Sequence, residues 1–134
     1  MKLANARAKG LRLESEFREI LERHGYSTYR PPKTRYGSTD IGGWGDILAW
    51  KPGCNPLLVQ IATNESAVAH RREARANDHA MTRAFILARF RPWLAIQYGA
   101  RPGAGDVKRG WWIERYERVH DGSDPPAEPL DEIW

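Results

Sequence analysis

Three polar residues, Glu14, Asp46 and Gln60, have types and positions that could do chemistry at one site. Asp46 follows the glycine-rich segment 42–45 and opens an apolar run, so we expect its side chain at a sheet end beside flexible backbone. Gln60 lies in the apolar segment 57–62, where a polar side chain is costly unless it finds a partner. Carboxylates that converge on a divalent cation can assist phosphodiester cleavage, because the metal stabilises the transition state and activates a water. These residues are therefore candidates for a metal site.

Each of the three residues also has a purely structural interpretation. Glu14 precedes Phe17 by three residues, so it flanks the buried stripe of a helix and can point at a sheet. The same spacing allows a surface pair between Glu14 and Arg18, one helical turn further on. Asp46 could instead cap the loop after the glycines, and Gln60 could be a hydrogen-bonded amide of the core. The sequence leaves these alternatives open.

The elements that must position these residues begin with a helix. Apolar residues at helical spacing predict a helix over residues 8–24, and Gly25 is placed as its C-terminal stop. Alternation predicts a short strand over residues 26–30, which ends at two prolines. Residues 31–45 hold glycines, prolines and basic residues, a composition typical of an exposed loop.

The next elements predicted are a strand at 46–50, a turn at 51–56 and a buried strand at 57–62. A basic helix or helix pair follows at 66–89 and is closed by Pro92. Two further strands, at 93–98 and 110–117, are separated by a loop at 99–109. The strands on either side of the turn form a central hairpin. This order of elements predicts an α/β sandwich around a mixed sheet. The tail after His120 is expected to be disordered.

Length and charge indicate one basic domain. The 134 residues, 41% apolar, can form one core, which we assign to residues 1–120, with a flexible acidic tail at 121–134. All 21 basic side chains lie in residues 1–120 with 12 of the 17 acidic ones, so this part carries a net +9. Such a surface favours an anionic partner such as nucleic acid, although plain solubility explains it equally well.

Cysteine usage and hydropathy set the expected compartment. The single cysteine, Cys54, excludes an internal disulfide framework, and the N-terminus lacks the apolar run of a signal peptide. No apolar stretch is long enough for a membrane span. We therefore expect a cytoplasmic protein with no membrane partner.

Basic and aromatic side chains mark a candidate nucleic-acid surface. The segment 70–75 places three arginines on neighbouring turns of the predicted helix, suited to phosphate contacts, although they could also be a solvated face. The loop before Asp46 adds basic and aromatic groups. The DNA-binding candidates are Lys33, Arg35, Ser38, Arg71, Arg72 and Arg75. Trp111 and Trp112 could stack on bases, but alternation along a strand favours one of them as a core residue.

Several of these segments resemble the archaeal-type Holliday junction resolvases of the PD-(D/E)XK nuclease superfamily. The resemblance spans roughly residues 9–117. The residues that carry it are Lys9-Gly10, Glu14, Phe17, Leu21, Gly25-Tyr26, Gly37-Ser38, Asp46-Ile47-Leu48-Ala49, Leu58-Val59-Gln60-Ile61-Ala62 and Trp111-Trp112-Ile113-Glu114. The segment with Asp46 is similar to the family's metal-binding strand, and the segment with Gln60 takes the place of its Glu-x-Lys strand.

The resemblance implies a restriction-endonuclease-like fold, in which a central mixed sheet is flanked by helices. It also implies an endonuclease of DNA recombination that cuts branched DNA, such as a four-way junction, by a water activated by Mg²⁺ or Mn²⁺. Glu14, Asp46 and Gln60 would be its catalytic and metal-binding residues. A homodimer is implied as well, because a twofold enzyme can cut both equivalent strands of a junction.

Two positions depart from the family pattern. Gln60 stands where the family has a metal-binding glutamate, and Ala62 stands where it has the catalytic lysine. An amide oxygen can ligate Mg²⁺ but brings no negative charge. His70, Arg71 or Lys51 could supply the missing positive charge. The alternatives to an active nuclease are a protein of the same fold that binds DNA without cleaving it, and a protein-binding regulator that uses the acidic tail.

Overall fold

The computed structural model describes residues 2–34, 37–38, 41, 45–63, 66–67, 88–98, 110–116 and 126–134. Its elements, in order, are α1 (Lys2–Arg23), β1 (Ser27–Tyr29), β2 (Lys33–Thr34), β3 (Gly37–Ser38), β4 (Ile47–Trp50), β5 (Leu57–Thr63), β6 (Arg91–Tyr98), β7 (Gly110–Arg115), β8 (Ala127–Pro129) and a 3-10 helix η1 (Leu130–Glu132). In these ranges, no helix has the length and apolar character that crossing a membrane requires.

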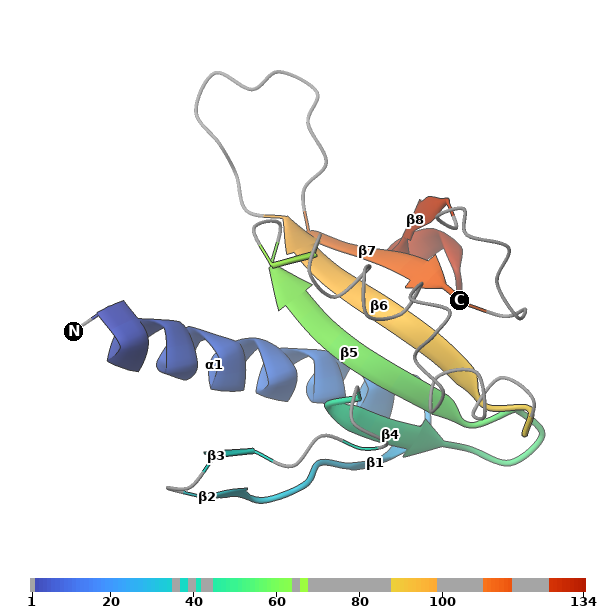
Figure 1. Cartoon of the computed structure of the whole chain (residues 1–134). Helices are drawn as coiled ribbons and strands as arrows, with labels where there is room; N and C mark the ends of the chain where they lie inside the picture. The colour runs from blue at the N-terminus through green and yellow to red at the C-terminus, as the bar shows by residue number, and fades with distance from the viewer. Residues whose placement is uncertain are drawn as a thin grey trace.

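Six strands form one mixed sheet in the order β1-β4-β5-β6-β7-β8. Only β5 and β6 pair in parallel, and the other neighbours are antiparallel. The central hairpin predicted from the sequence is the β4–β5 pair. Strands β2 and β3 form a separate small hairpin, which extends from the β1 side of the sheet (Figure 1). The predicted mixed sheet is therefore confirmed, and part of the predicted loop 31–45 is paired.

Helix α1 covers one face of this sheet and ends where the sequence predicts. Its buried side chains, Leu13, Phe17 and Leu21, follow the helical spacing. Gly25 has φ +90°, a conformation that L side chains rarely adopt. The main-chain N–H of Tyr26 donates to Leu21 O at 3.1 Å, and that of Gly25 to Glu22 O at 3.0 Å, which is the pattern of a Schellman cap. The helix begins at Lys2, earlier than the predicted start at residue 8.

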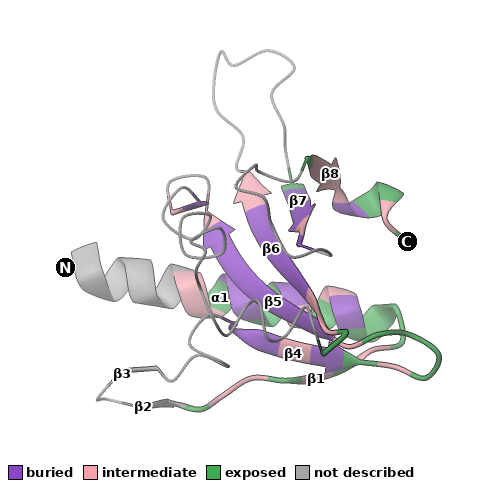
Figure 2. Cartoon of the chain, turned by 45° about the vertical axis from the view of Figure 1, so that its right-hand side comes forward, coloured by how far each residue is buried: buried purple, intermediate pink, exposed green. Residues whose placement is uncertain are grey.

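Buried side chains on β5 alternate between two clusters, one on each face of the sheet. Val59 and Ile61 belong to the cluster that contains Phe17 of α1. Leu58 and Ala62 belong to a second cluster on the opposite face. Because side chains alternate along a strand, Gln60 lies on the same face as Leu58 and Ala62, away from α1. Figure 2 shows the buried residues running along the central strands.

The predicted helix end and strand start near Pro92 need correction. Ala88 and Arg89 form a turn, in which Arg89 has φ 68°, so the helix predicted for 66–89 does not extend through them. Strand β6 begins at Arg91 and contains Pro92, although Pro92 was expected to close the helix. Proline lacks only its N–H, and the Pro92 carbonyl still accepts from Tyr116 N at 2.8 Å. Most of the predicted helix lies outside the described residues.

The prediction of a disordered tail is wrong for residues 126–134. Strand β8 pairs with the edge strand β7, and Leu130 is buried in the cluster beneath α1. Arg115 of β7 holds Glu128 through two hydrogen bonds of 2.6 and 2.8 Å. The Trp134 ring stacks on His24 with centroids 3.8 Å apart. Residues 121–125 lie outside the described ranges.

Candidate active site

Asp46 directly precedes β4 and lies beside the neighbouring strand β5. Its main-chain N–H donates to Val59 O at 2.7 Å, although Val59 is the strand partner of Ile47, so Asp46 lies one residue out of the β4–β5 register. The preceding residue, Gly45, is buried, and a Cβ built there would lie 2.7 Å from Leu58 Cγ. Only glycine therefore fits beside Asp46 without displacing Leu58. The chain therefore reaches Asp46 in close contact with β5.

The side chains of Asp46 and Gln60 are joined by a direct hydrogen bond. Gln60 Nε2 donates to Asp46 Oδ2 at 2.8 Å, and the main-chain N–H of Ile61 donates to the same oxygen at 2.9 Å. Gln60 Nε2 also donates to Ile61 O at 2.9 Å. Asp46 is 8% exposed and Gln60 5% exposed, so these bonds are shielded from water. Gln60 is thus a hydrogen-bonded amide of the core, and the side chain that accepts its hydrogen bond is the candidate site residue Asp46.

The orientation of the Gln60 amide is determined by its two neighbours. Asp46 Oδ2 and Ile61 O are both acceptors, and both lie within 2.9 Å of the same amide atom. An amide oxygen in that place would face two other oxygens, so the NH₂ group must occupy it. Gln60 therefore acts on Asp46 as a hydrogen-bond donor.

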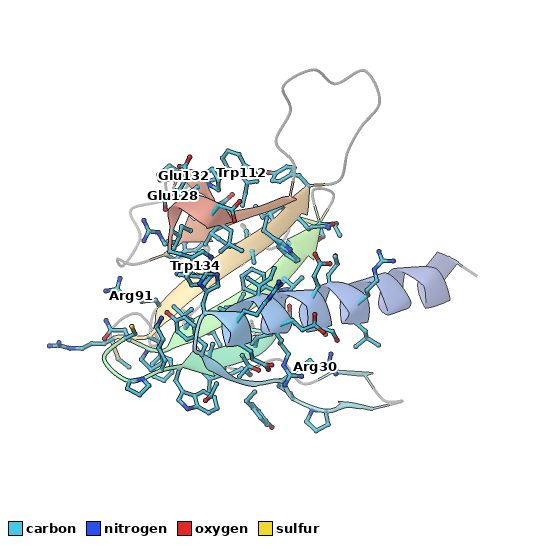
Figure 3. The ribbon with its side chains drawn as sticks, turned by 180° about the vertical axis from the view of Figure 1, so that it is seen from behind. Arg30, Arg91, Trp112, Glu128, Glu132 and Trp134 are labelled. Atoms are coloured by element: carbon cyan, nitrogen blue, oxygen red, sulfur yellow. The ribbon has the colours of Figure 1, made fainter. Side chains whose placement is uncertain are left out.

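Glu14 is buried, but its ionic partner is Arg30. It is 5% exposed, and its Oε2 lies 3.7 Å from Arg30 Nη1. The ion pair recorded for Arg18 is with Glu22, at 4.0 Å, and Arg18 Nε donates to Thr28 Oγ1 at 3.1 Å. Figure 3 shows Arg30 beside α1, on the side where β1 lies. Arg30 was missed in the sequence, where only its place at the end of a predicted strand, before two prolines, marks it.

Helix α1 brings Glu14 to the face of the sheet on which Phe17 is buried, whereas the alternation of β5 directs Gln60 toward the other face. Among the described residues, no group of three or more His, Cys, Asp and Glu side chains could hold a metal ion. The described residues thus bring together one pair of candidate side chains, Asp46 and Gln60. The Ile61 carbonyl lies beside them and accepts from the same Gln60 nitrogen.

A further buried carboxylate, Glu114, lies on the same face of the sheet as Gln60. Strand register places Leu94 opposite Gln60 and Glu114 opposite Leu94, so Glu114 is two strands away, roughly 10 Å across the sheet. Glu114 is 2% exposed, and Tyr116 Oη donates to its Oε1 at 3.2 Å. The signal in the sequence that could have identified Glu114 is an acidic residue within an apolar strand.

Lys51 is held at the other end of β4 from Asp46. Its Nζ donates to His24 O at 3.1 Å and lies 4.6 Å from the centre of the Tyr26 ring. Burial and the neighbouring Cys54 raise the pKa of Tyr26 above its ordinary value, and Arg91 partly offsets this. Lys51 follows Asp46 by five steps along the strand, about 16 Å. These contacts hold Lys51 away from Asp46 and do not favour its predicted role as a substitute for the missing lysine.

The remaining candidates divide into two groups. Ala62 is buried among Leu58 and Leu94, so the place of the family's lysine belongs to the core. Lys33 and Ser38 face each other as backbone partners in the β2–β3 hairpin. Trp111 is a core residue, 9% exposed, as expected for one of the two tryptophans. The candidates that lie outside the described residues are Arg35, His70, Arg71, Arg72 and Arg75.

Comparisons with known proteins identify the fold. No family model matches the chain, and a search of curated proteins finds no match. Among solved structures, the chain is similar to Hjc of Archaeoglobus fulgidus, described as a Holliday junction resolvase from an archaeal hyperthermophile. The TM-score is 0.52 at 16% sequence identity, and the match covers 92% of this chain and 98% of that chain. The chain therefore has an α/β, restriction-endonuclease-like fold of the resolvase type, which confirms the predicted fold class.

Proposed function

We propose that this protein is a structure-selective DNA endonuclease that acts on branched DNA with the help of Mg²⁺ or Mn²⁺. The observation that carries the proposal is the position of Asp46 in a resolvase-like fold. Its carboxylate is buried at the start of β4 and held against the middle strand β5 by Ile61 N. The net charge of +9 on residues 1–120 suits a polyanionic substrate. By analogy with the fold, the working unit would be a homodimer.

The oxygens around Asp46 fit a divalent cation. Asp46 Oδ2 and Ile61 O lie 2.8 and 2.9 Å from one common point, and hard cations prefer such oxygen ligands. Asp46 and the Ile61 carbonyl would hold the ion. A bound Mg²⁺ would supply Lewis-acid stabilisation of the charge that develops on the scissile phosphate. The chain itself would position the phosphate through basic side chains.

A second function, DNA binding without cleavage, is favoured by one observation. Gln60 presents its NH₂ group to Asp46, and the neighbouring position on that face is the buried Ala62. Neither residue supplies the negative or positive charge that the family pattern has in these places. Losing one such electrostatic group commonly lowers a rate by about 10²- to 10³-fold. A protein with this site could therefore recognise a junction without cutting it.

One experiment separates the two functions. Purified protein is mixed with a labelled four-way junction, or with a linear duplex of the same sequence, in EDTA, Mg²⁺ or Mn²⁺. We expect the junction to be bound in EDTA and cut when either metal is added, with the duplex left intact. Binding without cleavage in both metals would favour the second function. Equal and weak binding to junction and duplex would contradict both.

A further inference from the structure

The Gln60 amide nitrogen occupies the point on which two oxygens converge. Asp46 Oδ2 and Ile61 O each accept a hydrogen bond from it, and all three groups are buried. An arrangement in which a carboxylate and a carbonyl oxygen face one shared point is also the arrangement that a cation needs. We infer that the Gln60 NH₂ group takes the place of a cation in the resting protein, so that this amide and a divalent ion compete for Asp46.

The chemistry of the amide explains why it can take this place. An NH₂ group carries two donors and no negative charge, so each oxygen receives one hydrogen of the same nitrogen. A glutamate at position 60 would bring a second carboxylate to Asp46, and two buried carboxylates repel each other unless a cation lies between them. With Gln60, Asp46 is stabilised without any ion. The pair is therefore complete in the protein alone.

The competition follows from the geometry. An ion that binds Asp46 Oδ2 and Ile61 O must displace the nitrogen, because both would contact the same two oxygens. The amide would then lose its hydrogen bond to a charged acceptor, an interaction stronger than a neutral one. Asp46 itself would stay in place, since Ile61 N still donates to it. Gln60 thus lowers the affinity of the site for the ion that the proposed function requires.

The test measures ion binding without DNA, so its result does not depend on whether the protein cleaves. Mn²⁺ binding is followed by electron paramagnetic resonance of the free ion, and by the shift in melting temperature, for the parent, Gln60→Ala and Gln60→Glu. If the amide competes with the ion, Gln60→Ala binds Mn²⁺ roughly tenfold more tightly than the parent, because the displaced hydrogen bond is absent. Gln60→Glu binds more tightly still, and its melting temperature rises most.

The direction of the Gln60→Ala effect decides the inference. If Gln60 were instead an ion ligand through its oxygen, Gln60→Ala would bind Mn²⁺ more weakly than the parent. Weaker binding, or affinity equal to that of the parent, overturns the competition. Gln60→Ser serves as the second variant if the alanine protein does not fold, since its short hydroxyl cannot bridge both oxygens. Asp46→Asn in each background is the matched control, and it should remove the bound ion in all of them.

Discussion

At the scale of single residues, Asp46 is positioned by the backbone more than by its neighbouring side chains. Ile61 N belongs to β5 and donates to Asp46 Oδ2, and Asp46 N donates to Val59 O of the same strand. Main-chain groups of β5 therefore hold both the carboxylate and the backbone of Asp46. Gln60 adds a third bond that a substitution can remove without freeing Asp46. This separation makes the chemistry of the pair testable.

Asp46→Asn is the substitution that isolates the charge of the site. The asparagine oxygen can still accept from Ile61 N and from Gln60, so we expect the fold and junction binding to be unchanged. Metal-dependent cleavage should fall by about 10²-fold or more, because the anionic oxygen is lost. Junction binding in EDTA and cleavage in Mn²⁺ are measured in parallel. A variant that cuts as fast as the parent would mean that Asp46 is not part of the site.

At the scale of elements, the entry into β4 depends on the contact between Gly45 and Leu58. Gly45 is buried and exchanges two hydrogen bonds with Ile41, of 2.7 and 2.9 Å. A methyl group at Gly45 would meet the side chain of Leu58, which itself lies in the core. The glycine thus lets the chain approach β5 closely enough for Asp46 to reach Ile61 N. Gly45 is thus required both for the packing of the core and for the geometry of the site.

Gly45→Ala should lower the free energy of unfolding by about 1–3 kcal/mol, since the added methyl overpacks the core against Leu58. Gly10→Ala is the matched control. Gly10 lies within α1 with no atom near its added Cβ, so this change should stabilise the protein by about 0.5–1 kcal/mol. Urea denaturation followed by circular dichroism measures both. A harmless Gly45→Ala would show that the close approach is not required.

The C-terminal element completes the sheet and the core beneath α1. Leu130 is 5% exposed in that core, so Leu130→Ala should cost about 2–4 kcal/mol of stability. The control is Asp131→Ala, an exposed neighbour in the same 3-10 helix, for which we expect a change within about 0.5 kcal/mol. Both are measured by urea denaturation. If Leu130→Ala were as mild as the control, the tail would not be docked.

The parts of the fold that the sequence predicted are those with local signals. Gly25 ends α1, and the apolar runs around the turn 51–56 form the central hairpin. The tail was missed because acidic residues dominate its composition. Leu130 becomes a core residue only because β8 pairs with β7, which places Leu130 in the cluster beneath α1. Arg30 was missed for a similar reason. Its partner lies on another element, and spacing along one helix cannot reveal such a contact.

Within the candidate site, residue types were informative but their geometry was not. The oddity of a glutamine in an apolar strand correctly marked Gln60 as a residue with a buried partner. No pattern in the sequence could show that its nitrogen, rather than its oxygen, faces Asp46. That orientation is decided by Ile61 O, a main-chain atom whose position depends on strand pairing. The donor role of Gln60 is a property of the assembled sheet.

At the scale of the whole molecule, the unequal distribution of charge governs how the protein meets DNA. The arginines at positions 71 and 72 lie outside the described residues, so their expected role rests on the charge of the sequence. If both contact phosphates, Arg71→Ala with Arg72→Ala should weaken binding to junction and duplex alike. The slope of log affinity against log salt should become shallower by roughly two, since each phosphate contact contributes about 0.9.

The matched control for this prediction is Arg12→Ala with Arg23→Ala, which removes the same charge from exposed positions on α1. Helix α1 covers the face of the sheet opposite Gln60, so this pair tests net charge without altering the face on which Gln60 lies. Titrations over a range of salt concentrations measure both slopes by fluorescence anisotropy. Equal changes in the two pairs would mean that DNA responds only to the overall field of the protein. A shallower slope for Arg71→Ala with Arg72→Ala alone would assign phosphate contacts to these two arginines.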